Sequence, residues 1–165
     1  MVQMAEQLPS PISLPIPEDC HAKVKALQDY WRSKHPEAGL PGRQHIDPVD
    51  IPELLPNIWL IDVHRNPYRF KFRLLGTQVV NYAGEDNTGR WFDERWPNYD
   101  PSVFIDIVES RRPSWARGRS KMRPEKDYYE MERVRFPLAS DGETVDIILA
   151  LTVFFDSKGQ EILQG

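Results

Sequence analysis

Histidine and cysteine, the residue types that most often bind metals or act as nucleophiles, are few and scattered in this chain. The histidines have no second ligand at helical i,i+4 spacing: they are His21, His35, His45 and His64. Cys20, the only cysteine, adjoins His21, but two neighbouring residues cannot complete a zinc site. Cys20 also precedes the predicted core and is a poor nucleophile. Because hydrolase and phosphate-loop motifs are absent too, we predict no catalytic residue and no metal site.

A run of basic residues that contains one tryptophan follows the middle of the chain. It comprises Arg111, Arg112, Trp115, Arg117, Arg119, Lys121 and Arg123. Basic and aromatic side chains on one strand face can bind single-stranded nucleic acid. However, Glu130 and Glu132 lie on the strand expected to pair with this run, and the net charge of −4 attracts no polyanion. We predict a salt-bridged, solvated face and no nucleic-acid partner, with nucleic-acid binding as the alternative.

The predicted strands differ in how their apolar residues are distributed along the sequence. Segments 58–63 and 145–155 are apolar at nearly every position, whereas segment 68–75 alternates apolar and basic residues. Continuous apolar runs are typical of strands covered on both faces, and alternation is typical of a strand with one wet face. We therefore expect the first and last strands to be central. In segment 68–75 we expect Leu74 to share the buried side with Phe70 and Phe72.

Helices are expected at 19–34, at 77–82 and from about 101 to 110. Asp19 is the expected N-cap of the first helix. A hairpin is expected next, with arms 114–123 and 128–138 and Arg119 opposite Glu132 on the wet face. The apolar alternation changes phase along the second arm, and a β-bulge near Glu132 would explain this change.

The length of 165 residues suits one domain with a true core. Pro9, Pro11, Pro15 and Pro17 prevent regular structure at the start of the chain. We predict a proline-rich tail at 1–18, a single domain at 19–156 and a C-terminal tail at 157–165. No apolar stretch approaches the ~18 residues that a membrane span requires. The single cysteine suits a reducing compartment, so we expect a cytoplasmic protein without membrane association.

The order of the expected elements, two strands, short helices, a longer helix and three strands, resembles the PAS architecture. Residues 46–56 (IDPVDIPELLP) resemble the entry motif of a bacterial PAS-like family formerly described as a domain of unknown function. Residues 73–77 (RLLGT) and 84–90 (GEDNTGR) resemble its middle motifs, and 132–133, 137–138 and 141–149 resemble its last two strands. The resemblance covers about residues 25 to 155. It implies an α+β fold with a five-stranded antiparallel sheet of order 2-1-5-4-3, short helices on one face and an N-terminal helix. It also implies a sensory or signalling role and supplies no catalytic residues.

The resemblance places the middle helices over a strand face that carries small residues, Ala116, Gly118 and Ser120. Small residues leave space, and mostly apolar pockets with a few polar groups are typical of small-molecule sites. We predict a site for a small organic ligand lined by Tyr82, Trp91, Phe104, Trp115, Gly118, Tyr129 and Met131. The alternative is that these aromatic side chains simply fill the core.

The residues that common PAS cofactors require can be looked for in the middle segment, residues 77–111. This segment contains neither the cysteine that a photoactive flavin site needs nor a histidine for axial haem ligation. We therefore predict no cofactor, although a flavin held without a covalent bond stays open.

The second face of the central strands also needs a cover, which the first helix or a second subunit would supply. We predict a homodimer built on Leu27, Tyr30 and Trp31, with relay of a signal from helix 101–110 to an unidentified protein partner. One alternative is a pure interaction and dimerisation module with a filled core. Another is an enzyme on a cone-shaped α+β fold, for which Asp62, Asp146 and Glu132 are the strand acids available.

Overall fold

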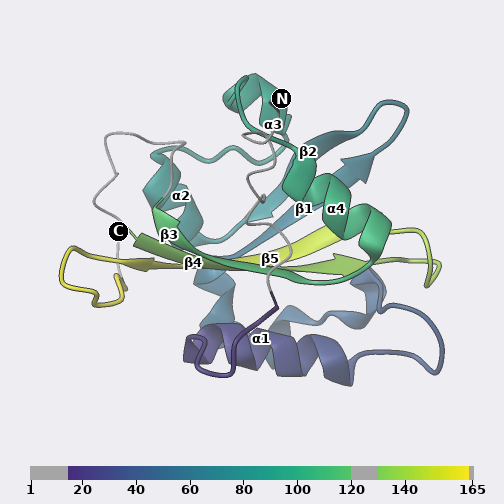
Figure 1. The fold of residues 1–165 in the computed structure, drawn as a ribbon, viewed down its shortest axis with the longest axis horizontal. Coiled ribbons are helices and arrows are strands. Elements are labelled where there is room, and N and C mark those ends of the chain that lie inside the picture. The colour runs from purple at the N-terminus through teal and green to yellow at the C-terminus, as the bar shows by residue number, and fades with distance from the viewer. Residues whose placement is uncertain (1–14, 120–129, 164–165) are drawn as a thin grey trace, which may run out of the picture.

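A five-stranded antiparallel sheet in the order β2-β1-β5-β4-β3 forms the centre of the computed structural model (Figure 1), which describes residues 15–119 and 130–163. The strands are β1 (Ile58–His64), β2 (Arg69–Leu75), β3 (Ser114–Arg119), β4 (Glu130–Leu138) and β5 (Ile147–Phe155). The α+β fold and the strand order expected from the sequence are confirmed.

Helices cover both faces of the sheet. Helix α1 (Ala22–Ser33) lies on one face, and α2 (Thr77–Ala83), α3 (Phe92–Arg95) and α4 (Ser102–Ser110) lie on the other (Figure 1). Three short 3-10 helices, Arg43–His45, Pro48–Asp50 and Pro52–Asn57, connect α1 to β1. Helix α1 therefore covers the second face of the central strands within the same chain.

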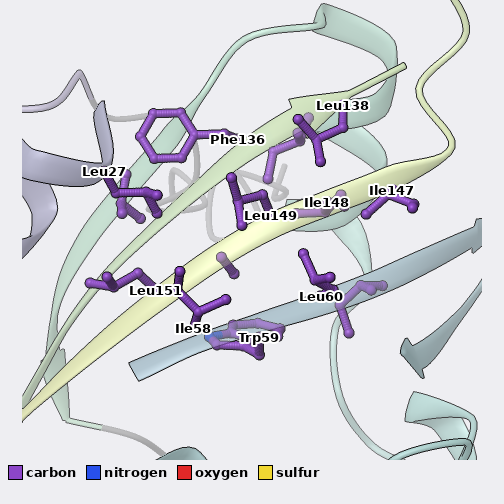
Figure 2. Packing of buried hydrophobic residues seen from close by; sticks show 14 of the residues in the cluster. Leu27, Ile58, Trp59, Leu60, Phe136, Leu138, Ile147, Ile148, Leu149 and Leu151 are labelled. Atoms are coloured by element: carbon purple, nitrogen blue, oxygen red, sulfur yellow. The ribbon is translucent and has the colours of Figure 1, made fainter. Parts of the chain in front are cut away.

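The continuous apolar strands are the central ones because each of them contacts two layers. Every residue of β5 is buried, and β5 pairs with both β1 and β4. On the α1 side, Leu149 and Leu151 pack with Leu27 of the helix and Phe136 of β4 (Figure 2). Burying such aliphatic and aromatic side chains contributes about 1.5–3 kcal/mol each.

The start of α1 and the segment after β5 differ in local structure from the sequence expectations. His21, rather than Asp19, caps α1, because its ring nitrogen accepts the backbone N–H of Lys23 at 3.0 Å. Residues 157–163, expected to form a tail, turn back onto the sheet, and the Ile162 N–H donates to the Phe154 carbonyl at 2.8 Å. The Asp156 carboxylate favours this reversal, since it accepts the N–H groups of Lys158 and Gln160.

The predicted hairpin register and bulge are wrong. Arg117 lies opposite Glu132 and Arg119 opposite Glu130, which is two residues from the expected register. The pairing of β4 with β3 and β5 runs without interruption through Glu132, so no bulge lies there. The apolar pattern of β4 changes phase without a bulge. From Arg133 onward the polar residues, Arg133 and Arg135, occupy the strand face that points toward α4, and the apolar residues occupy the other face.

Among the strand pairings of the described residues, the register shifts once, between β1 and β2 at Leu60 and Ile61. It shifts the end of β2, so Leu74 is 42% exposed and does not share the buried side of Phe70 and Phe72. In the described residues, no helix combines the length and the apolar character that a membrane crossing needs.

Candidate functional site

A cavity of about 810 Å³ lies between the sheet and the layer formed by α2, α3 and α4. Its aromatic lining comes from both layers and comprises Trp59, Phe72, Tyr82, Phe92, Trp96, Tyr99, Phe104 and Phe154. Its polar lining includes Arg95, Arg119, Arg133, Arg135, Asn98, Asp100 and Thr152. Ligand pockets typically measure about 300–1,000 Å³ and combine apolar walls with a few polar groups.

The floor of the cavity is shaped by small residues that flank two arginines of β4. Arg135 pairs with Ser114 of β3 and with Ala150 of β5, and Ala150 in turn pairs with Trp59 of β1. Arg133 lies between Ala116 and Thr152 in the same way. Because paired residues point to the same face of a sheet, the short neighbours leave room for both guanidinium groups to extend over the strands.

Arg135 is buried, with 9% of its surface exposed. Its guanidinium carbon lies 5.7 Å from the ring centre of Trp59 and 5.6 Å from that of Phe104, so two aromatic faces stabilise the charge. Burial lowers the pKa of Arg135 to about 9, and the neighbouring charge of Arg133 acts in the same direction. Arg135 therefore remains a cation at neutral pH.

Several donors around the cavity lack an acceptor in the part of the chain that the structure describes. The buried Nε atoms of Arg133 and Arg135 and the indole nitrogen of Trp96 make no hydrogen bond there. Burial also lowers the pKa of Arg133. Buried donors without partners are rare in native proteins and need an explanation.

The roof of the cavity is a cluster of aromatic rings. Phe92 of α3 contacts Phe72, Tyr99 and Phe104 with ring centres 4.5, 4.7 and 5.1 Å away. Tyr82 of α2 stacks on Phe154 of β5 at 5.0 Å. These contacts hold the short helices over the sheet while their inner rings line the cavity.

The charged groups at the rim are largely paired. Arg95 forms an ion pair with Glu85 at 2.8 Å and lies over the Trp96 ring at 4.6 Å. Asp100 is exposed, and its carboxylate accepts the backbone N–H of Ser102 at 2.9 Å. Asp100, the acidic residue of the described lining, is therefore exposed to solvent and bonded to the first backbone N–H of α4.

The structure brings together three of the seven predicted ligand-site residues. Tyr82, Phe104 and Met131 line the cavity, and Gly118 pairs with Met131 at its end. Tyr129 lies outside the described residues. Gly118 has a φ of +155°, a conformation that residues with a side chain rarely adopt, so backbone geometry favours glycine there, while the space beside its Cα is open.

Trp91 and Trp115 do not line the cavity. The Trp91 ring lies outside β2, with its centre 4.0 Å from the Arg69 guanidinium and 4.8 Å from the His64 ring centre. Its neighbour Phe92 enters the cavity instead. Trp115 points to the opposite face of the sheet, where its indole N–H donates to the Glu132 carboxylate at 2.9 Å.

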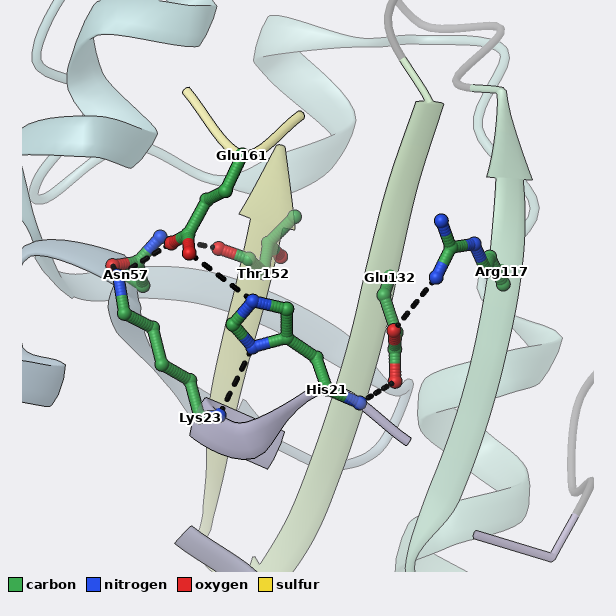
Figure 3. Close-up of polar contacts among 7 residues, drawn as sticks. All are labelled: His21, Lys23, Asn57, Arg117, Glu132, Thr152 and Glu161. Atoms are coloured by element: carbon green, nitrogen blue, oxygen red, sulfur yellow. Dashed lines mark hydrogen bonds and ion pairs between the residues drawn. The ribbon is translucent and has the colours of Figure 1, made fainter. Parts of the chain in front are cut away.

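Glu132, expected on a wet face, is buried beneath the start of α1 with 1% of its surface exposed. Its carboxylate accepts the backbone N–H of His21 at 3.0 Å and the Arg117 guanidinium at 3.1 Å (Figure 3). Arg117 also pairs with Glu130 at 3.0 Å. Within the described residues of the basic run, Arg117 is thus salt-bridged as expected, while Lys121 and Arg123 lie outside the described residues.

The residues of α1 predicted to form a dimer interface contact other parts of the same chain. Leu27 and Trp31 are buried against the sheet, and the Trp31 indole donates to the Pro137 carbonyl at 3.1 Å. Tyr30 is half-buried, and its hydroxyl donates to the Asp50 carboxylate at 2.8 Å. Leu27 and Trp31 therefore cover the second face of the sheet themselves, and a homodimer stays a prediction.

The three strand acids considered for an enzyme do not line the cavity. Asp62 pairs with Arg73 at 3.1 Å, and Asp146 accepts the Ser140 hydroxyl at 2.6 Å. Glu132 lies on the α1 side of the sheet. In the described ranges 15–119 and 130–163, no group of three or more histidine, cysteine or acidic residues is placed to hold a metal ion.

Sequence reasoning missed Arg133 and Arg135 as residues of the site. Arg133, Arg135 and Met131 alternate with Glu132, Val134 and Phe136 along β4, and this period of two was the signal that could have found them. With Val134 and Phe136 in the core, the two arginines must face the opposite layer.

A comparison with models of protein families matches residues 20–152 to the family described as PAS domain. No curated protein matches the chain. The matched range begins next to the N-cap of α1 and ends in β5, so it contains the cavity lining except Phe154.

Proposed function

This chain belongs to the PAS domain family, and from that premise we propose that it is a sensory domain that binds a small organic ligand and relays its presence to a protein partner. The family suggests a sensory or signalling role at the general level. The single observation that carries the finer proposal is the 810 Å³ cavity under α2, α3 and α4, with aromatic walls and donors that have no acceptor among the described residues.

A ligand in this cavity would contact α4 through Phe104. The Phe104 ring lies 5.0 Å from Phe70, 5.1 Å from Phe92 and 5.6 Å from the Arg135 guanidinium. A molecule that binds Arg135 or fills the space beside it changes the contacts of this ring. Because Ile107 and Val108 anchor the same helix in the core, a displacement at Phe104 shifts the packing of α4 on the sheet.

A second route connects the cavity to the opposite face of the sheet. The indole of Trp59 donates to the Thr152 hydroxyl at 2.9 Å, and the Thr152 carbonyl accepts the Asn57 amide at 2.9 Å. Asn57 then accepts Lys23 of α1 at 3.3 Å, and Lys23 pairs with Glu161 (Figure 3). Hydrogen bonds thus link a cavity wall to the start of α1, a surface on which a partner could read the bound state.

Native mass spectrometry of the freshly purified protein tests the ligand-binding proposal. We expect a bound species of small mass that is released on unfolding. The rate of amide hydrogen exchange in α4, residues 102–110, is expected to differ between the ligand-bound protein and the protein from which the ligand has been removed. A protein that carries no small molecule, and that binds none from a panel of aromatic compounds, contradicts the proposal.

An interaction module is the second candidate, and a separate apolar groove favours it. This groove measures about 430 Å³ and is lined by Ile46, Ile51, Leu55, Leu60, Leu74 and Leu149 among others. Leu74 is 42% exposed and Val49 is 81% exposed. Exposed apolar patches often mark interfaces. A stable dimer in sedimentation experiments that is lost on Leu74→Glu, together with an empty cavity, would favour this function over ligand sensing.

A further inference from the structure

We infer that the cavity selects an organic anion, with its negative group between Arg133 and Arg135 of β4 and its apolar body under the aromatic rings of α3 and α4. This inference rests on the proposed function, since it names the class of ligand for the same cavity. The observation behind it is that two arginines face the cavity without an acidic partner among the described residues.

The charges around the cavity are unbalanced toward the positive. Arg95 is paired with Glu85, and the exposed Asp100 is engaged with the first turn of α4. In the described residues, neither Arg133 nor Arg135 makes an ion pair or hydrogen bond through its side chain. A negative group of a ligand would therefore meet cations that no carboxylate of the described protein already neutralises.

Burying a cation without a partner is costly, so a purely structural role explains these arginines poorly. The desolvation penalty of a buried ion exceeds the stabilisation that the aromatic faces of Trp59 and Phe104 return to Arg135. A leucine or methionine at the position of Arg135 would fill the same volume without that penalty. The small neighbours Ser114 and Ala150 also keep space open beside the guanidinium group instead of filling it.

The position of the arginines suggests how the anion binds. Arg133 and Arg135 are two residues apart on one strand face, which separates their Cα atoms by about 6.5–7 Å. Two guanidinium groups at that spacing can converge on one carboxylate or phosphate through charge-assisted hydrogen bonds. The indole N–H of Trp96 supplies a further donor from the opposite layer. The aromatic rings of the roof then favour a flat or apolar body on the same molecule.

Two fluorescent probes with the same aromatic body test the inference. The anionic probe is 8-anilinonaphthalene-1-sulfonate, and the neutral probe is N-phenyl-1-naphthylamine, which lacks the sulfonate. The full-length chain is first unfolded in guanidinium and refolded, so that bound molecules are removed. We expect the anionic probe to bind at least about tenfold more tightly than the neutral one, since charge-assisted hydrogen bonds to the sulfonate add to the contacts that both probes share.

Variants then connect this preference to the two arginines. Arg135→Gln and Arg133→Gln are each expected to weaken the anionic probe about tenfold and to change the neutral probe by less than about twofold. Arg135→Lys keeps the charge and is expected to restore part of the affinity. Arg112→Gln is the matched control, because it removes an exposed charge from the segment that precedes β3. We expect it to leave the affinity for either probe unchanged. Near-ultraviolet circular dichroism checks that each variant keeps its packed core.

The outcomes separate this inference from the proposed function. Equal binding of both probes, or variants that weaken both equally, overturns the anion inference and leaves a cavity for neutral ligands. Binding of neither probe to the wild-type protein overturns the small-molecule proposal as well. Displacement of the anionic probe by 1-naphthoate or by 1-naphthyl phosphate, compared at equal concentration, tells whether a carboxylate or a phosphate is preferred.

Discussion

The buried carboxylate of Glu132 accepts the backbone N–H of His21, the N-cap of α1, at 3.0 Å. The same carboxylate receives the Trp115 indole and the Arg117 guanidinium, from β3. Hydrogen bonds to this one side chain of β4 thus connect both the start of α1 and the edge strand β3 to the sheet. A buried anion with three donors is stabilised by each of them, and its removal leaves those donors without an acceptor.

We therefore expect Glu132→Ala to lower the free energy of unfolding by about 3–5 kcal/mol, the usual cost of breaking a buried charge network. Glu130→Ala is the matched control, because Glu130 pairs with the same Arg117 but is half-exposed. Exposed pairs contribute about 0–1 kcal/mol, so this variant should be nearly neutral. Urea denaturation at pH 7 measures both. Equal losses in the two variants would contradict the special role of Glu132.

Arg135→Met is expected to stabilise the ligand-free domain. Arg135 is buried and its Nε has no partner in the part of the chain that the structure describes. Replacing such a charge by an apolar side chain of similar volume removes its desolvation cost, and we expect a gain of about 1–3 kcal/mol. Stability and binding would then change in opposite directions, as is common at functional sites. The measurement is urea denaturation of the refolded protein, with Arg112→Met as the exposed control. A clear loss of stability would mean that Arg135 has a structural partner.

The central position of β1 and β5 could be predicted from the sequence because their apolar runs reflect covering on both faces. The space beside Ala116 followed from small residues on an inward strand face. Trp115, however, is next to Ala116 in a strand, so the two cannot point to the same face. Alternation alone therefore excludes Trp115 from the cavity.

The position of Arg133 and Arg135 on the cavity side of β4, with Arg135 buried, could not be read from residue type, because arginine rarely occupies a core. The expectation that Glu132 lies on the wet face made a bulge necessary to place Val134 and Phe136 in the core. Uninterrupted pairing of β4 removes the bulge and places the arginines inside. The prediction that Trp91 lines the cavity is wrong for another reason. A shift of one residue at the start of α3 decides whether Trp91 or Phe92 enters the cavity. Sequence patterns do not locate the start of a helix to within one residue.

Tyr99 provides a test of burial at the cavity wall. Burial raises the pKa of its phenol to about 12, with Asp93 adding to the effect. An unfolded tyrosine ionises near pH 10, so the unfolded state loses this proton first, and the contribution of Tyr99 to stability falls between about pH 10 and 12. The absorbance titration of the wild type minus that of Tyr99→Phe isolates the group. A midpoint near 10 in this difference curve would contradict the burial of Tyr99.

Lys23 tests whether the bound state of the cavity reaches α1. Its ammonium group contacts Asn57 and Glu161, and Asn57 connects through Thr152 to Trp59 of the cavity wall. We expect Lys23→Met to keep the affinity for 8-anilinonaphthalene-1-sulfonate, since Lys23 does not line the cavity. The change in hydrogen exchange that the probe causes in the first turns of α1 should become smaller, because the link from the sheet to the helix is broken.

Lys25→Met is the matched control on the same helix. Lys25 is exposed and pairs with Asp29 four residues further along α1. This variant should respond to the probe as the wild type does, while α4 should respond equally in all three proteins because its contact with the cavity through Phe104 is unchanged. If Lys23→Met leaves the response of α1 intact, the signal reaches this helix by packing through the core, and the hydrogen-bonded route carries none of it.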